Sequence, residues 1–345
     1  QPPTTPPAPA PGVVVQPATP SGPARGVRPA VRASERTRIV VLSPGLSATL
    51  AALGWADFIV GRHGYDTYLD PSVPVCGDQA GLDYEALLRA RPTHVFLEWG
   101  SRPLPERLTQ LATQQGWVVR SFPMLTLADA RAAAMGMHGA LLEHRADSTP
   151  APPVPELKAD PKPADQQVHR EALRRATRPR FLPRTPTAER GAWLVERMDL
   201  AWSRVGRGDL SRAGRLLVLI STQPPAALGP GSAHHEILRA MGARPVPEEG
   251  APYIELDAED VARLAPDAIL LVRPRAPGTP ALRRTARESL DALGAIGRLR
   301  IPAVQRGRVE VMDDPYALTP GPPLIDWADR AADALGAWAG GEGGN

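Results

Sequence analysis

Two stretches of this chain follow one pattern: a short apolar run, a turn rich in Ser, Pro and Gly, and an amphipathic helical pattern ending in glycine. They cover residues 38–54 and 215–242. The pattern is typical of a buried parallel strand that leads into a helix, with the turn at the carboxyl end of the strand. Open α/β sheets bind ligands at those ends. We therefore expect the turns at 43–46 and 222–229 to form opposite walls of one cleft.

The length of the chain and the distribution of its prolines suggest two domains separated by linkers. A chain of 345 residues can form two domains, each with its own core. The 41 prolines crowd two stretches in which apolar periodicity disappears, as is typical of disordered linkers. We predict a Pro-rich disordered linker at 1–36, an N-terminal lobe at 37–146, a Pro-rich charged insertion at 147–186, an interlobe helix at 187–206, a C-terminal lobe at 207–340 and a disordered tail at 341–345.

Charge and cysteine content exclude several classes of protein. The net charge is +3, but many of the arginines and lysines lie in or beside the two Pro-rich stretches, so the folded body is less basic. We therefore do not expect nucleic-acid binding. The single cysteine, Cys76, excludes an internal disulfide or multi-cysteine metal site and is expected to be a small buried side chain. No apolar run approaches the ~20 residues that span a bilayer, and a chain starting at Gln1 is expected to be processed.

Strand and helix patterns alternate through both predicted lobes. The strand HVFLEW, for example, is followed by a helix opened by proline and then by the strand WVVRSF. A helix from about Leu127 to Glu143 closes the first lobe, and Asp257 is a plausible N-cap in the second. Such alternation predicts the α/β class, with two Rossmann-like lobes of mostly parallel strands. The apolar spacing in 187–206 predicts one helix of about twenty residues, roughly 30 Å long, between the lobes.

The ordered set of motifs resembles the substrate-binding proteins of vitamin B12, haem and siderophore importers. The motifs are IVVLSPGLSATLAALG, GRHGYDTYLDP, GLDYEALLRARPTHVFLEWG, ALGPGSAHHEILRAMGA, YIELDAEDVARLAPDAILLV and RVEVMDDPYALTPGPPLIDW, and together they span nearly all of residues 37–340. The resemblance implies two α/β lobes joined by one long helix, with a ligand cleft between them. It also implies a non-enzymatic, monomeric protein with an ABC permease as its partner.

Within that class the vitamin B12 binders look most similar. Tyr65 and Tyr68 match paired tyrosines of the first-lobe turn, and Trp99 matches a tryptophan just after a strand. Flat aromatic faces bury much area around a large ligand, although each of these rings could instead be ordinary core packing. Tyr316, in the last loop of the cleft, is a weaker candidate. The resemblance therefore puts cobalamin first, with a siderophore or haem next.

Arginines in loops after strands favour an anionic ligand instead. Arg102, Arg273 and Arg275 lie at such positions, as does Arg62, and guanidinium groups pair with anionic oxygens. They could contact a ferric siderophore or haem propionates, and the tyrosines could supply a phenolate to haem iron. Surface positions in solvent are the alternative for each arginine. The remaining predicted ligand-binding residues belong to the two turns: Ser43, Pro44, Thr222 and Gln223.

Two glutamates are candidates for contact with the permease. Glu85 and Glu236 match the one glutamate per lobe with which this class docks onto permease arginines. Isolated surface ion pairs contribute only about 0–1 kcal/mol, so their value would lie in orientation. Alone, each is explained as a helix-dipole residue.

Other functions have less support in the residues. Adjacent histidines in His234-His235-Glu236 point in different directions on a helix, so we expect no metal site there. A chelatase-like tetrapyrrole enzyme would need a cleft histidine, for which His63 is a candidate, and a binding protein without a transporter is a further alternative. No Gly-rich phosphate loop or nucleophile elbow is present, and we predict no catalytic residue and no cofactor. We expect an exported protein, periplasmic or anchored at the cell envelope as a lipoprotein, whose ligand itself contains cobalt or iron.

Overall fold

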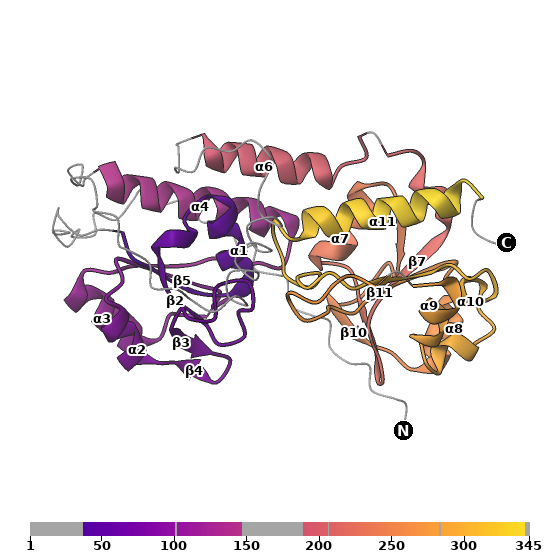
Figure 1. Ribbon diagram of the computed structural model, residues 1–345, viewed down its shortest axis with the longest axis horizontal. Coiled ribbons are helices and arrows are strands. Elements are labelled where there is room, and N and C mark those ends of the chain that lie inside the picture. The colour runs from indigo at the N-terminus through magenta and orange to yellow at the C-terminus, as the bar shows by residue number, and fades with distance from the viewer. Residues whose placement is uncertain (1–36, 101, 147–188, 206, 283, 342–345) are drawn as a thin grey trace, which may run out of the picture. The chain divides into compact units, whose positions relative to one another are not determined.

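The computed structural model describes residues 37–100, 102–146, 189–205, 207–282 and 284–341. The predicted linker at 1–36 and the insertion at 147–186 lie outside the described residues, as do 342–345 of the tail. Within the unit Arg32–Asn345, the described chain forms two lobes, each with its own sheet between layers of helices (Figure 1). No helix in the described ranges is long and apolar enough to cross a membrane.

The first lobe contains a six-stranded sheet in the order β4-β3-β2-β1-β5-β6. All neighbouring strands are parallel except β3 and β4, which are antiparallel. Its elements are β1 Ile39–Leu42, α1 Pro44–Ala52, η1 Ala56–Phe58, β2 Ile59–His63, β3 Val75–Asp78, β4 Gly81–Leu82, α2 Tyr84–Ala90, β5 His94–Leu97, α3 Glu106–Gln115, β6 Val118–Ser121 and α4 Leu127–Ala146.

The second lobe repeats this plan around β7, whose neighbours β9 and β11 are both parallel to it. The sheet order is β10-β8-β7-β11-β12, with β9 pairing with the first part of β7. After α6 Arg190–Ala201, its elements are η2 Leu210–Ala213, β7 Arg215–Thr222, β8 Pro225–Leu228, α7 Ala233–Ala240, β9 Arg244–Val246, β10 Tyr253–Glu255, α8 Ala258–Leu264, β11 Ala268–Val272, α9 Ala286–Asp291, η3 Ile296–Arg298, α10 Pro302–Gln305, β12 Val309–Met312 and α11 Leu324–Ala339.

The segment after β7 differs from the expected turn. Residues 225–228 form strand β8, which folds back antiparallel on the end of β7 and pairs with β10. The prediction of a single turn at 222–229 was therefore wrong, and only the tip of this hairpin is a turn. Alternation of apolar and polar residues is too short in PAAL to distinguish a strand from a loop.

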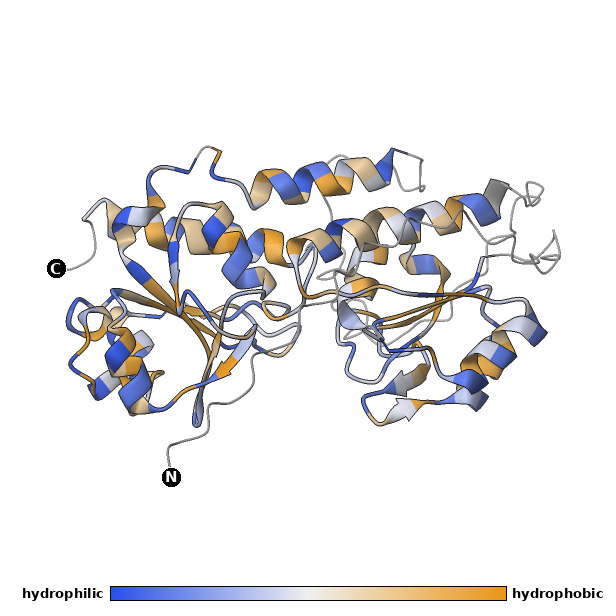
Figure 2. Cartoon of the chain, turned by 180° about the vertical axis from the view of Figure 1, so that it is seen from behind, coloured by the Kyte–Doolittle hydropathy of each residue, from blue (hydrophilic) through white to orange (hydrophobic). Residues whose placement is uncertain are grey.

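The two faces of the sheets are buried in different ways. On one face, strand residues of both lobes pack with α1, α4, α6, α7 and α11 in a single hydrophobic cluster that includes Ile39 and Phe96 of the first lobe and Leu216 and Leu270 of the second. On the other face each lobe has its own core, with α2 and α3 in the first and α8 and α10 in the second. Apolar residues accordingly fill the strands (Figure 2). On the first of these faces the two lobes therefore share one core.

Helix α6 is shorter than the predicted interlobe helix. It runs over Arg190–Ala201, 12 residues, and residues 189 and 202–205 of the predicted helix are not helical, while 187–188 and 206 lie outside the described residues. It packs on α4 of the first lobe and on α11 of the second, and just beyond its end the indole of Trp202 donates to the Leu324 carbonyl oxygen at 3.4 Å. The long helix of the described chain is α4, with 20 residues; it was expected to end near Glu143. Tertiary packing rather than helix length joins the lobes.

Candidate functional site

The turn after β2 is organised by one arginine. The guanidinium of Arg62 donates to the carbonyl oxygens of Val73 at 2.9 Å and of His63 and Asp66 at 3.1 Å each. Arg62 is thus engaged with the backbone of the turn rather than available to an anionic ligand. The turn that it holds carries two tyrosines, one exposed and one buried.

The two predicted tyrosines of this turn have different surroundings. Tyr65 is 65% exposed, and its ring lies 5.7 Å from the ring of His63. Burial lowers the pKa of the half-buried His63 imidazole, which favours its neutral form. Tyr68 is only 4% exposed. Tyr65 can therefore reach a ligand, whereas Tyr68 is part of the packing between lobes.

Tyr68 and Tyr316 meet across the two lobes. Their rings are in edge contact with centroids 4.7 Å apart, and the Tyr316 hydroxyl donates to the Thr67 carbonyl oxygen at 3.1 Å. Close by, a Cβ atom on Gly45 would lie 3.0 Å from the Pro320 carbonyl oxygen, so α1 approaches the loop before α11 closely. We call these contacts, made by Gly45, Thr67 and Tyr68 with Tyr316 and Pro320, the interlobe seam.

A buried carboxyl, Asp66, supports the seam. It is 3% exposed and accepts from the amides of Tyr68 at 2.8 Å and Leu69 at 3.2 Å. Desolvation raises its pKa, although hydrogen bonds to Ser47, Tyr68 and Leu69 and the charge of Arg62 oppose this. Ser47 bonds both to this carboxyl and, at 2.9 Å, to the Pro44 carbonyl oxygen. The Ser47 hydroxyl is therefore shared between the Asp66 carboxyl and the first turn of α1.

The carboxyl ends of β1 and β5 carry further polar groups of the first lobe. Ser43 is the N-cap of α1 and donates to Glu98 Oε2 at 2.9 Å, and Pro44 occupies the first turn of that helix. Glu98 is exposed, yet desolvation by neighbouring atoms raises the pKa of its carboxyl. Trp99 is half-buried, and the exposed Arg102 lies over its ring at 5.2 Å. Trp99 and Arg102 thus form one surface beyond β5.

The predicted residues of the second lobe are less closely grouped. Arg273 is exposed after β11, and Thr222 and Gln223 lie at the tip of the β7–β8 hairpin. Arg275 donates to the carbonyl oxygens of Thr279 at 2.7 Å and Asp313 at 2.8 Å. Of these two arginines, Arg273 is the one available to a ligand.

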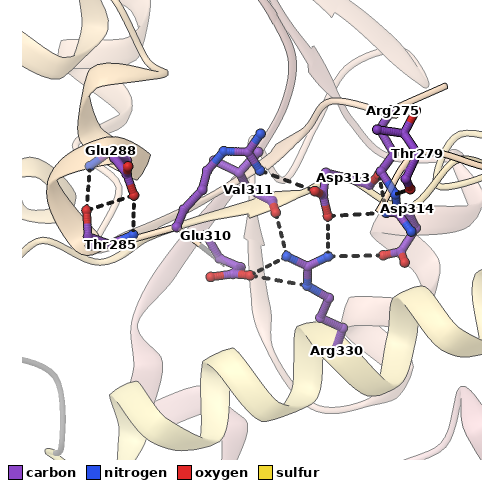
Figure 3. A network of polar contacts seen from close by, with 10 residues as sticks. Arg275, Thr279, Thr285, Glu288, Glu310, Val311, Asp313, Asp314 and Arg330 are labelled. Atoms are coloured by element: carbon purple, nitrogen blue, oxygen red, sulfur yellow. Dashed lines mark hydrogen bonds and ion pairs between the residues drawn. The ribbon is translucent and has the colours of Figure 1, made fainter. Parts of the chain in front are cut away.

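Three arginines surround Asp313, directly after β12 (Figure 3). Arg330 Nη1 donates to Asp313 Oδ1 at 2.7 Å, Arg284 Nη1 to Oδ2 at 3.3 Å, and Arg275 Nη1 lies 3.5 Å from Oδ1. The carboxylate is 2% exposed. Desolvation alone would raise its pKa, but the hydrogen bond and charge of Arg330, with the charges of Arg275 and Arg284, hold that pKa below its ordinary value.

The two predicted docking glutamates occupy different surroundings. Glu85 is exposed in the first turn of α2. Glu236 is half-buried, and its Oε2 accepts from the backbone amide of Leu127 at 2.8 Å, at the start of α4. The carboxylate of Glu236 therefore caps a helix of the other lobe.

The structure places Glu259, rather than Glu236, at the position equivalent to Glu85. Helices α2 and α8 both begin after an aspartate N-cap, Asp83 or Asp257, and both carry the glutamate at the next-but-one residue. Both end at a non-glycine residue with positive φ and precede a central strand. The repeated LDYE and LDAE sequences carry this signal, but sequence analysis paired Glu85 with the wrong helix. The N-cap at Asp257 is confirmed and forms a capping box.

The two adjacent histidines of α7 have structural partners. His234 is buried, its Nε2 lies 2.6 Å from the Ala317 carbonyl oxygen, and burial lowers its pKa to about 4. His235 Nε2 contacts the Pro247 carbonyl oxygen at 3.2 Å. Among the described residues no group of three His, Cys, Asp or Glu side chains could hold a metal ion. The single cysteine, Cys76, is buried.

Comparisons by sequence find no relative. No protein-family model matches the chain, and no curated protein matches it.

Solved structures match the chain over most of its length. The periplasmic heme-binding protein BhuT in complex with two hemes is 22% identical, with 88% of this chain and 98% of that chain covered and a TM-score of 0.58. The periplasmic heme-binding protein RhuT from Roseiflexus sp. RS-1 is 18% identical, with coverages of 88% and 100% and a TM-score of 0.57. The periplasmic vitamin B12 binding protein BtuF of Vibrio cholerae is 17% identical, with coverages of 87% and 97% and a TM-score of 0.55.

This chain has the fold of the periplasmic binding proteins. The expected architecture of two α/β lobes with largely parallel sheets is confirmed. The three matched structures are heme-binding or vitamin B12 binding proteins. At these identities the likeness establishes the fold, and the ligand is a question for the residues of the site.

Proposed function

We propose that this protein is the solute-binding component of an ABC importer that captures a tetrapyrrole-sized metal chelate between its lobes. The observation that carries the proposal is the exposed phenol of Tyr65 beside His63, at the carboxyl end of β2. Parallel sheets bind ligands at such ends. Tyr65 and His63 are side chains that can bind a ferric iron, and haem-binding proteins share the fold.

Haem is the ligand that these residues support best, although the sequence alone favoured cobalamin. A ferric haem offers an open coordination site for a phenolate and two propionates for guanidinium groups. Arg102 after β5 and Arg273 after β11 are exposed and supply one guanidinium from each lobe. Cobalamin is the second candidate, supported by the likeness to BtuF and by the half-buried face of Trp99.

A titration of the purified protein with haemin, cyanocobalamin and a ferric hydroxamate tests the proposal. We expect haemin to bind, and Tyr65→Phe to weaken it at least about tenfold and to change the haem absorption spectrum. The matched control is Tyr253→Phe, because Tyr253 is also exposed but lies on β10. Equal haemin binding by the Tyr65 and Tyr253 variants would exclude Tyr65 as a ligand. Tight binding of cyanocobalamin alone would establish the second candidate.

Delivery to a permease is proposed to use Glu85 and Glu259. Both carboxylates are exposed in equivalent first turns, on helices that cover the same side of their sheets. Exposed charges orient a partner and steer its approach. We expect Glu85→Gln combined with Glu259→Gln to reduce ligand import by cells while ligand affinity stays unchanged. Glu236→Gln is the control, because an amide oxygen can still accept from Leu127. Normal import by the double variant would overturn this assignment.

Export to the periplasm, free or as a lipoprotein, completes the proposal. It is supported by the fold, which the chain shares with periplasmic proteins. Fractionation of cells that express the natural gene tests it, and a purely cytosolic protein would contradict an import function.

A further inference from the structure

The connection between β12 and α11 begins in the second lobe and touches the first. Asp313 is its first residue, and three residues later Tyr316 contacts Thr67 and Tyr68 at the interlobe seam. In this segment Asp314 also accepts from Arg330 Nη1 at 3.4 Å, and just beyond Tyr316 the Ala317 amide donates to the Asp314 carbonyl oxygen while the Ala317 carbonyl oxygen contacts His234. The direction of the connection where it leaves β12 therefore determines whether Tyr316 reaches the first lobe.

The main chain at Asp313 is held from the loop that follows β11. Its carbonyl oxygen accepts from the backbone amide of Arg275 at 3.1 Å and from Arg275 Nη1 at 2.8 Å. Arg275 itself is fixed by donating to Thr279. Two hydrogen bonds to one carbonyl oxygen leave little freedom for the peptide that follows it.

The side chain of Asp313 is held from α11 and from the segment before α9. Arg330, on α11, spans the end of β12: Nη1 donates to Asp313, while Nη2 donates to the Val311 carbonyl oxygen and to Glu310, each at 2.7 Å. Arg284 completes the cluster. The Asp313 carboxylate is the partner that these three guanidinium groups share, and without it Arg275 and Arg284 would lose their counter-charge here while Arg330 keeps Glu310 and Asp314.

We infer that Asp313 is a positioning residue for the interlobe seam: by gathering Arg275, Arg284 and Arg330, it directs the connection so that Tyr316 reaches Thr67. Only the consequence for the ligand rests on the proposed function, namely that Asp313 also slows release of a ligand held between the lobes. The contact across the lobes is independent of ligand identity.

Hydrogen exchange of the ligand-free protein tests the inference directly. In Asp313→Asn we expect the Ala317 and Thr319 amides, which bond within the connection, to exchange at least roughly tenfold faster. The amides of Tyr68 and Leu69 in the first lobe are expected to change in the same direction. Faster exchange confined to the second lobe would contradict a role at the seam.

The matched control is Asp267→Asn. Asp267 pairs with Arg306 at 2.7 Å and accepts from the Arg215 amide at 2.9 Å, at the amino end of β11. Asp267 is thus also an aspartate paired with an arginine in the second lobe, but it lies at the amino ends of the strands, whereas Asp313 lies at their carboxyl ends. Its loss lowers stability without changing exchange at Tyr68 or Leu69. Equal exchange changes in both variants would show a general loss of stability and overturn the inference.

A milder variant keeps the test decisive if Asp313→Asn does not fold. Arg284 contributes one 3.3 Å contact and borders a cavity of about 350 Å³, so Arg284→Gln can be accommodated. It should accelerate the same amides by a smaller factor, and no acceleration would overturn the inference. With haemin, we expect faster dissociation from the Asp313 variant than from the Asp267 variant. If wild-type protein binds no haemin, the proposed ligand fails, while the exchange result still decides the role of Asp313.

Discussion

Each lobe buries one aspartate almost completely, and the two carboxyl groups behave in opposite ways. Asp66 in the first lobe is 3% exposed and Asp313 in the second is 2% exposed. The pKa of Asp66 is raised because desolvation outweighs its hydrogen bonds to Ser47 and two amides. The pKa of Asp313 is lowered because guanidinium groups outweigh desolvation. Burial alone therefore does not determine the charge of a carboxyl group; its partners do.

The two aspartates support the same seam by different means. Asp66 bonds the amide of Tyr68, and Asp313 begins the connection that carries Tyr316. In the first lobe the carboxyl is held by hydrogen bonds from Ser47 and two backbone amides, in a turn already held by Arg62. A charged network suits the second lobe, where several segments must be gathered at one point.

The largest expected effect is on stability at neutral pH. Asp313→Asn should lower the free energy of unfolding by about 2–3 kcal/mol, since it removes the counter-charge of the partly buried Arg275 and Arg284, whereas Arg330 keeps Glu310 and Asp314. Asp66→Asn should stay within about 1 kcal/mol of wild type, since the amide keeps an oxygen that can accept from the Tyr68 and Leu69 amides and removes the cost of burying a charge. Urea denaturation at pH 7 measures both. Equal losses of unfolding free energy in the two variants would contradict the expected difference between Asp66 and Asp313.

The pH dependence of these variants should differ in sign. The stability that Asp313 contributes is present above the ordinary aspartate pKa, about 3.9, and is lost as pH falls through its lower folded pKa. The contribution of Asp66 is present below that ordinary pKa and is lost as pH rises through its raised folded pKa. As the pH falls, the loss of unfolding free energy caused by Asp313→Asn should therefore become smaller. The wild-type protein should at the same time become more stable relative to the Asp66→Asn variant. The free energy of unfolding of wild type and both variants can be measured between pH 7 and 3. Parallel curves would mean that neither aspartate has a shifted pKa, which would contradict the prediction.

A smaller effect is expected at the equivalent helices α2 and α8. Asp83→Ala and Asp257→Ala each remove an N-cap and should cost about 1 kcal/mol. The cost should be greater for Asp257, because its capping box also satisfies its own amide through Asp260. Thermal unfolding of both variants measures the difference, and a larger loss from Asp83 would argue against the box.

The smallest effect concerns the ring contact across the seam. A double-mutant cycle with Tyr68→Leu and Tyr316→Leu should give a coupling energy of about 0.5–1 kcal/mol, as edge-to-face pairs do. Chemical denaturation of the four proteins supplies it. A coupling of zero would mean that the rings touch without stabilising the seam.

Several features could be predicted from the sequence because they depend on neighbours along the chain. Apolar runs followed by glycine-ended helical patterns predicted the strands and helices around β1 and β7, and Asp257 predicted the start of α8. Local patterns could not predict β8, because its pairing with β7 and β10 depends on a sheet that the rest of the lobe forms. The predicted interlobe helix also included residues 202–205, which are not helical.

The candidate site likewise has some features that the sequence predicted and others that depend on tertiary contacts. The residues themselves indicated aromatic and arginine groups after strands, and the motif order indicated the fold. Only the tertiary structure decided that Tyr65 is exposed while Tyr68 is buried, that Arg275 serves Asp313, and that Glu236 caps α4. The sequence by itself determined the secondary structure units and the two-lobe plan, since these follow from local periodicity and capping. Which polar groups remain available to a ligand was decided by partners far away in the chain, because hydrogen bonds and ion pairs form between groups that folding brings together.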